Sequence, residues 1–140
     1  MDMQWFLERD AFAKLLGIRI IDAAPGYAKT AMDLTDDLKN GAGIAHGGAV
    51  FTLADLALAV ASNSYGRLAL AVASTITYVR PGSGSTLYAE AREISRASKL
   101  ATYAITISNE SGVAVAACQG TVYCKDVPYT KETAGAGEKV

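Results

Sequence analysis

The chain has few of the residues on which metal sites, disulfide frameworks and nucleic-acid-binding surfaces depend. Its 140 residues include one histidine and two cysteines, so no cluster of zinc ligands is expected. The formal net charge is −1 at pH 7, without the basic excess that is typical of nucleic-acid-binding proteins. Cys118 and Cys124 do not make a disulfide framework, and a reduced compartment fits them best.

The N-terminus also lacks the features of a secretion signal, because Met1-Asp2-Met3-Gln4 is not a basic start followed by an apolar core. The main apolar segment is shorter than the roughly 20 residues that a membrane span needs. A cytoplasmic location without a membrane partner is therefore expected. Since 51% of the residues are hydrophobic, we expect a single domain over residues 1–125 and a flexible tail over 126–140.

One stretch, residues 40–66, organises the rest of the chain. A Gly-rich loop leads from Asn40 to His46, and residues 49–61 then contain many alanines and leucines but no proline or glycine. This composition predicts a helix, and its nearly uniform apolar surface predicts burial on all sides. The helix carries one charged residue, Asp55. A buried carboxylate needs compensating partners, so Asp55 is either functional or a structural residue bound by backbone or hydroxyl donors.

The start of this helix is a candidate oxyanion site. Helix N-termini present free N–H groups, and Gly47 and Gly48 let a ligand oxygen approach the backbone. A tight turn is the alternative interpretation. Gly47 and Asp55 are eight residues apart, or about 12 Å along one helix, which is too far for both to act on one carbonyl. We therefore expect the two groups to come from different copies of the chain in a symmetric dimer.

The remaining segments predict one more helix and a sheet. An amphipathic helix is expected over residues 3–16, ended by Gly17. Strands are expected at residues 18–23, 27–34, 68–79, 87–95, 100–108 and 113–124, with Pro25-Gly26 and residues 109–112 as turns. Short connections between strands indicate an antiparallel sheet, and the central helix is the element available to cover it. The sequence therefore predicts an α+β fold.

The sequence around the central helix and in the strand that follows it resembles the hotdog-fold acyl-CoA thioesterases of the phenylacetic-acid-degradation type. The resemblance covers residues 15–123 and rests on Asn40, His46-Gly47-Gly48, residues 51–55, Asn63-Ser64 and residues 75–82. It implies a hotdog fold, in which an antiparallel six-stranded sheet wraps around a long central helix. It also implies an acyl-CoA thioester hydrolase without a cofactor, coenzyme A being part of the substrate. A homodimer would form the site, and two dimers would pair into a homotetramer.

By the same resemblance, the Gly47 N–H polarises the thioester carbonyl, and Asp55 activates water or attacks the carbonyl itself. Asn40 orients the thioester or is a turn residue. His46 also matches the catalytic motif, and its side chain either shapes the loop, which is the favoured role, or carries protons. Asn63 caps the helix end and lines the pocket together with Ser64. One departure is that some relatives carry a serine on the strand facing the base. Ala71 holds the matching position here, and Ser74 and Thr75 are out of place.

Further residues are candidates for substrate binding. Gly48 belongs to the expected oxyanion loop, and Phe51 and Tyr78 could stack on an aromatic ring, which favours aryl or arylacetyl groups ahead of medium-chain acyl groups. Arg80, Arg96 and Lys99 are candidates for coenzyme A phosphates, with solvated surface charge as the alternative.

Two other functions fit parts of the pattern. A non-catalytic acyl-CoA-binding hotdog protein would keep the fold while Asp55 served structure. A hotdog hydratase is disfavoured, because those enzymes pair an Asp with a His at a different spacing.

Overall fold

The computed structural model describes residues 2–134, which form three α-helices, one 3-10 helix and six β-strands. The helices are α1 (Met3–Glu8), α2 (Ala11–Leu15), η1 (Asp36–Leu38) and α3 (Gly47–Asn63). The strands are β1 (Arg19–Ala24), β2 (Tyr27–Asp33), β3 (Arg67–Tyr78), β4 (Thr86–Arg96), β5 (Leu100–Asn109) and β6 (Ala114–Pro128).

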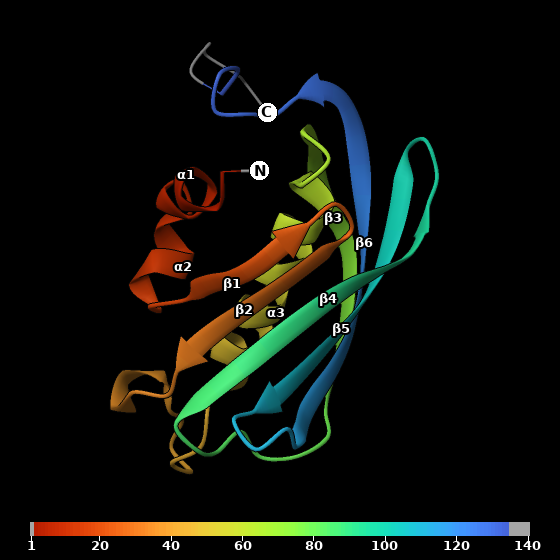
Figure 1. The fold of residues 1–140 in the computed structure, drawn as a ribbon. Coiled ribbons are helices and arrows are strands. Elements are labelled where there is room, and N and C mark those ends of the chain that lie inside the picture. The colour runs from red at the N-terminus through yellow and green to blue at the C-terminus, as the bar shows by residue number, and fades with distance from the viewer. Residues whose placement is uncertain (1, 135–140) are drawn as a thin grey trace.

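All six strands form one antiparallel sheet in the order β1-β2-β4-β5-β6-β3. The sheet curves around α3, which contacts every strand (Figure 1). This arrangement confirms the predicted α+β architecture of a six-stranded sheet wrapped around a central helix. Because the order ends on β1 and β3, these two strands leave backbone hydrogen-bonding groups open at the edges of the sheet.

The core lies between α3 and the concave face of the sheet. On β4, Leu87, Ala89 and Ala91 alternate with more exposed residues and are fully buried, as the sequence pattern predicts. Leu53 and Val60 of α3 are fully buried on the opposite side of this core. No helix within residues 2–134 is long and apolar enough to cross a membrane.

The N-terminal segment differs from the single helix expected over residues 3–16. Helix α1 ends at Glu8, and the Asp10 carboxylate accepts a hydrogen bond of 2.9 Å from the Ala13 N–H. Asp10 is thereby the N-cap of a second helix, α2. An Asp side chain competes with the helix backbone for an N–H donor. Asp10 therefore interrupts the amphipathic pattern, and a new helix begins after it.

The C-terminal strand also runs farther than expected. Strand β6 continues to Pro128, and the Tyr129 ring lies 5.4 Å from the Trp5 ring of α1. Lys131 forms an ion pair of 3.3 Å with Asp2, which brings the two ends of the described residues together (Figure 1). Strand β6 therefore extends past residue 125, after which the tail was expected to begin. The part of the expected tail over residues 135–140 lies outside the described residues.

Candidate active site

The N-terminus of α3 is fixed by the chain's single histidine. His46 is the N-cap of the helix, and its Nδ1 accepts a hydrogen bond of 2.9 Å from the Gly48 N–H. A Cβ at Gly48 would lie 3.0 Å from that Nδ1, so the close imidazole contact needs a glycine. The His46 N–H donates to the Leu38 carbonyl at 2.8 Å. The Nδ1 bond gives the imidazole a role in capping the helix, and the backbone bond holds the loop.

Gly47, the first residue of the helix, has a free donor. Its carbonyl accepts a hydrogen bond of 2.9 Å from the Tyr78 hydroxyl at the end of β3. Its N–H has no hydrogen-bond partner within residues 2–134. Such an N–H, at the positive end of a helix of 17 residues, is suited to receive a ligand oxygen.

Gly47 lines a cavity of about 380 Å³. Asn40 lines the same cavity, and its Oδ1 accepts hydrogen bonds from the Ala42 and Ile44 N–H groups at 3.0 and 3.4 Å. Arg80 donates one guanidinium hydrogen bond of 3.1 Å to a backbone carbonyl and keeps other donors for a ligand. The structure therefore brings together four predicted residues: Asn40, Gly47, Tyr78 and Arg80.

Asp55 lies outside that cavity and is not buried as the sequence predicts. One stripe of α3, at helical spacing, is left accessible, and it contains Gly48, Phe51, Thr52, Asp55 and Ala59. Asp55 is exposed, while its helix neighbours Ala54 and Leu56 are 0% and 2% exposed. The helix is thus buried on most of its surface but open along the side that carries the carboxylate.

The surroundings of Asp55 are nevertheless apolar. Partial burial of Asp55 among apolar side chains raises the pKa of its carboxyl above the ordinary value. The nearby Asp10 charge raises this pKa further. Asp55 lines a second cavity, of about 170 Å³, together with Ala71 of β3. The expectation that Ala71 stands on the strand facing Asp55 agrees with this cavity. Gly47 and Asp55 therefore open onto different cavities of one chain.

Two predicted substrate-binding residues lie at the other end of the sheet. Arg96, at the end of β4, packs its guanidinium 3.6 Å from the centre of the Tyr65 ring and 4.0 Å from a Glu93 carboxylate oxygen. Lys99 is exposed in the β4–β5 turn. Neither lines the Gly47 cavity. Arg80 is therefore the predicted phosphate ligand that the fold places at that cavity.

Two other predicted residues lie on α3. Phe51 is half-buried on the accessible stripe between Gly47 and Asp55. Asn63 is 4% exposed, and its amide donates to the Ala59 and Ala69 carbonyls while its Oδ1 accepts from the Ala69 N–H. The Asn63 side chain thereby joins the end of α3 to the start of β3.

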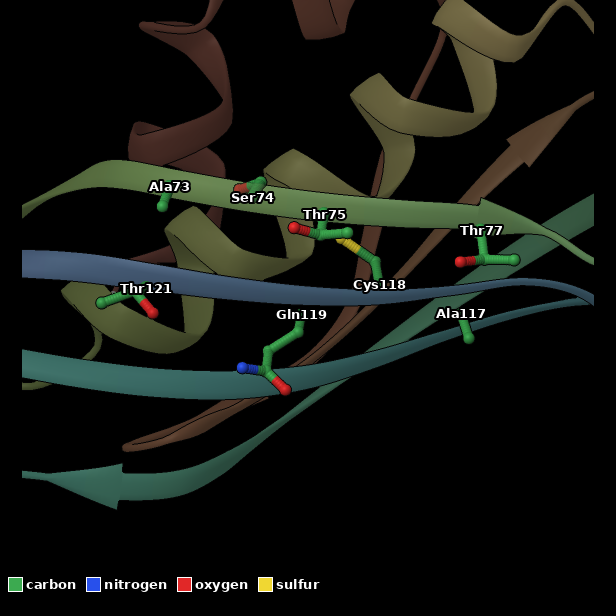
Figure 2. A pocket seen from close by; sticks show the side chains of 8 residues that line it. All are labelled: Ala73, Ser74, Thr75, Thr77, Ala117, Cys118, Gln119 and Thr121. Carbon is green, nitrogen blue, oxygen red and sulfur yellow. The ribbon is translucent and has the colours of Figure 1, made fainter.

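A wider hollow of about 510 Å³ lies along β3 and β6. Figure 2 shows its uncharged side chains, with α3 behind the two strands. They are Ala73, Ser74, Thr75, Thr77, Ala117, Cys118, Gln119 and Thr121. None of the predicted catalytic residues lines it. Burial raises the pKa of the Cys118 thiol, and the Asp55 charge adds to that effect, so Cys118 is a poor nucleophile.

No group of three or more potential metal ligands occurs in the described part of the chain. The groups that the two cavities offer a ligand include the Asp55 carboxylate and the Asn40, Tyr78 and Arg80 side chains.

Comparisons with known proteins identify the family of the chain. The family model of the thioesterase superfamily matches residues 42–116. The chain belongs to the thioesterase superfamily. The acyl-coenzyme A thioesterase PaaI of Escherichia coli K12 is 43% identical over 114 residues, which are 81% of this chain and 81% of that protein. The hotdog fold and the membership inferred from the sequence are confirmed, and the chain is an enzyme of this superfamily.

Solved structures extend the likeness to the whole fold. The PaaI protein of the E. coli phenylacetic acid degradation operon matches with a TM-score of 0.87 and 38% identity, covering 91% of this chain and 93% of that one. A variant of the phenylacetic acid degradation protein PaaI from Thermus thermophilus matches with a TM-score of 0.77 and 38% identity. That match covers 81% of this chain and 98% of the other.

The sequence analysis missed one residue at the Asp55 cavity. Ser62 lines the Asp55 cavity, and its spacing of seven residues from Asp55 is the signal that could have found it. Ser74 pairs with Gly120 across the sheet, and a Cβ at Gly120 would meet Leu58 of α3 at 2.5 Å. Paired residues share one face of a sheet, so the Ser74 side chain faces α3. The sequence alone did not indicate this orientation.

Proposed function

We propose that this enzyme hydrolyses acyl-CoA thioesters in sites that two copies of the chain complete together. In each site the Gly47 N–H of one copy polarises the thioester carbonyl. Asp55 of the other copy activates a water molecule or attacks the carbonyl. The observation that carries the proposal is the free Gly47 N–H at the start of α3, with the Asp55 carboxylate on the open stripe of the same helix.

The shared site is supported by the open side of the molecule. Strand β3 is an edge strand, and its Leu70 and Val72 side chains are 38% and 60% exposed. Two copies that joined their β3 edges would cover this apolar surface and bring the accessible stripes of their α3 helices together. A two-fold axis between antiparallel helices would place Gly47 of each copy near Asp55 of the other.

The chemistry requires few groups. The Gly47 N–H and the helix dipole stabilise the negative charge that develops on the carbonyl oxygen. A carboxylate whose pKa is raised by apolar surroundings is a stronger base than an ordinary aspartate. If Asp55 acts as base, it takes a proton from water, the resulting hydroxide bonds to the carbonyl carbon, and the carbon–sulfur bond then breaks to release the coenzyme A thiolate.

The substrate is proposed to be an aryl or arylacetyl thioester of coenzyme A. Phe51 lies on the open stripe of α3, and Tyr78 lines the Gly47 cavity, so both rings are accessible to a ligand. Arg80 lines the Gly47 cavity and has free guanidinium donors for a phosphate. Medium-chain acyl groups are the second candidate.

The first test is thiol release from a panel of acyl-CoA thioesters by the native chain and by Asp55→Asn. We expect the native chain to hydrolyse ring-bearing thioesters, and the folded variant to lose about 10²- to 10⁴-fold in kcat. Equal rates would contradict the role of Asp55. Binding of these thioesters without turnover by either folded protein would instead identify a non-catalytic acyl-CoA-binding protein.

The Gly47 donor can be tested with little disturbance of the helix. Proline is favoured at the first helical position and removes the N–H, and the extended backbone of His46 (φ −60°, ψ 133°) suits a residue before proline. Gly47→Ala is the matched control, because it keeps the N–H while placing the same Cβ 3.3 Å from the Tyr78 ring. We expect Gly47→Pro to lose about 10²- to 10³-fold more in kcat than Gly47→Ala.

Mixing the two kinds of variant tests whether a site spans two copies. Homodimers of Asp55→Asn and of Gly47→Pro should both be inactive. A heterodimer formed from both chains would contain one intact site, made of Gly47 from the first chain and Asp55 from the second. Recovery of activity on co-expression is the expected result. No recovery in a proven heterodimer would show that both groups act within one chain.

A further inference from the structure

The C-terminal end of α3 borders a cavity that none of the predicted catalytic residues lines. Its volume is about 280 Å³, and its walls come from three segments, within residues 2–5, 63–66 and 129–132. These segments lie together at one end of the molecule (Figure 1). The cavity shares no lining residue with the Gly47 cavity or the Asp55 cavity. The 17 residues of α3 separate it from Gly47 by about 24 Å.

One wall of this cavity is aromatic. Trp5 and Tyr129 both line it, and their ring centres are 5.4 Å apart. Both side chains are half-buried and pack against the core. The Trp5 ring already attracts one cation, since the Arg9 guanidinium lies 5.5 Å from its centre. The face of an aromatic ring binds a cation more strongly where water is excluded, so this wall suits a ligand that is both apolar and positively charged.

The lining carries more negative than positive charge. The Asp2 carboxylate accepts a hydrogen bond of 2.9 Å from the Trp5 N–H, which lowers the pKa of this carboxyl. Hydrogen bonds from its own backbone N–H and from the Thr130 side chain lower the pKa of the Glu132 carboxyl. Both groups are therefore ionised at neutral pH. Lys131 pairs with Asp2 at 3.3 Å, which leaves Glu132 without a cation among the residues that line the cavity.

The end of α3 adds to this negative potential. The C-terminus of a long helix carries a partial negative charge, which a basic residue in the last turn often balances. The last turn of α3 contains no basic residue. Asn63 lines the cavity, but its amide group donates to the Ala59 and Ala69 carbonyls, so both amide hydrogens are already used. This end of the helix therefore favours a cation over an anion.

We propose that this cavity binds a small organic cation, an ammonium group on an apolar body. The charged group lies between Glu132 and the end of α3, and the apolar groups contact the Trp5 and Tyr129 rings. The Lys131 ammonium competes with the ligand for the negative charge of the cavity. An apolar protein cavity of about 150 Å³ holds benzene, so the larger cavity here accommodates an ammonium with several carbon atoms. The site is independent of the proposed thioester reaction.

The test titrates the native chain with choline and follows the fluorescence of Trp5, the only tryptophan in the chain. The matched control ligand is 3,3-dimethylbutan-1-ol, which has the shape of choline without its charge, and sodium chloride controls for ionic strength. We expect a saturable change with choline and about tenfold weaker binding of the alcohol, the contribution of a partly desolvated cation–π contact. Equal binding of the two ligands would overturn the proposal. So would the absence of a saturable change with choline, tetramethylammonium and butylammonium alike.

Two substitutions of opposite sign locate the bound cation. Glu132→Gln keeps the shape of an exposed side chain and removes its charge, so it should weaken choline binding about two- to fivefold. Lys131→Gln removes the competing ammonium and should strengthen binding by a similar factor of about two to five. Asp37→Asn, in η1 and outside the cavity, changes the net charge as Glu132→Gln does and should leave the affinity unchanged. Weaker choline binding in Lys131→Gln would overturn the proposal, because it would indicate a site for anions.

Thermal unfolding provides a second measurement. The cavity exists only while α1, the end of α3 and the segment after β6 are folded together, so choline should raise Tm, whereas the alcohol at the same concentration should raise it less. A fluorescence change that is not accompanied by a rise in Tm would overturn the assignment of choline to this cavity. Neither measurement uses thioester hydrolysis, so a failure of the proposed function and a failure of the cation site would be seen separately.

Discussion

The contact between Gly82 and Ala45 allows the oxyanion loop to be displaced in a controlled way. Gly82 is buried in the β3–β4 connection, and a Cβ added there would lie 2.7 Å from the Ala45 Cβ. Carbon atoms prefer separations of about 3.5–4.0 Å, so Gly82→Ala must push the two segments apart by about 1 Å. The Gly82 φ is not in the left-handed region, so an alanine there meets a steric conflict and no backbone strain.

The consequence should appear in both stability and activity. Overpacking of this size lowers the free energy of unfolding by about 1–3 kcal/mol. The displaced loop leads directly into His46 and Gly47, and a shift of about 1 Å at a reacting group can cost up to about a hundredfold in rate. We therefore expect Gly82→Ala to lower both the urea midpoint and kcat/KM, the second by more than the lost stability alone explains.

A double-mutant cycle identifies the cause. Ala45→Gly removes the carbon that the new methyl group meets, so it should recover most of the stability and activity lost in Gly82→Ala. The expected coupling energy is about 1–3 kcal/mol. Additive effects of the two substitutions, or native stability and activity for Gly82→Ala, would refute the steric reasoning.

Three further substitutions test other parts of the structure. Tyr78→Phe removes the hydroxyl that binds the Gly47 carbonyl and should lower kcat/KM by about three- to tenfold; an unchanged value would show that this bond does not position the helix start. Asp55 has a raised pKa, so it destabilises the fold at neutral pH. Asp55→Asn should therefore raise Tm at pH 7, with a gain that disappears at pH values below the ordinary Asp pKa of about 3.9; a gain that persists there would contradict this sign. Glu93→Ala leaves the fully buried Tyr103 hydroxyl without its acceptor and should lower the free energy of unfolding by about 1–3 kcal/mol, measured by urea unfolding; Glu93→Gln, which keeps an acceptor, should lose less.

The fold was predictable because each element has a strong local pattern. Alternating residues marked β4, an uninterrupted apolar segment marked α3, and Pro25-Gly26 marked a turn in which Gly26 has a φ of +78°. The two misplaced boundaries depend on single interactions that periodicity does not show. One is the Asp10 cap that starts α2, and the other is the packing of Tyr129 on Trp5 that follows the longer β6.

The candidate site was predictable only in part. Residues 40–46 form one local loop that leads directly into Gly47, so the sequence placed Asn40, His46 and Gly47 near one another before any tertiary contact was known. The cavity between α3 and β3 instead depends on the register of β3, which contains a bulge between Ala71 and Ala73. A bulge changes which residues face the helix beyond it. Sequence alignment therefore reached Ala71 but gave no indication that Ser74 also faces α3.

A helix with an almost entirely apolar sequence need not be fully buried by its own chain, as the open stripe of α3 shows. The sequence predicts burial on all sides, yet the sheet covers most of the helix and leaves the stripe containing Phe51 and Asp55 accessible. Apolar residues on that stripe, beside an edge strand whose Val72 is 60% exposed, form the surface that a second copy would cover in the proposed dimer. The same covering would remove water from Asp55 and raise its pKa further. Dimer formation and the reactivity of the carboxylate would therefore depend on one surface. A substitution that weakens the contact between two β3 edges should leave Asp55 with a lower pKa, and so shift the acid limb of the pH–rate profile toward lower pH.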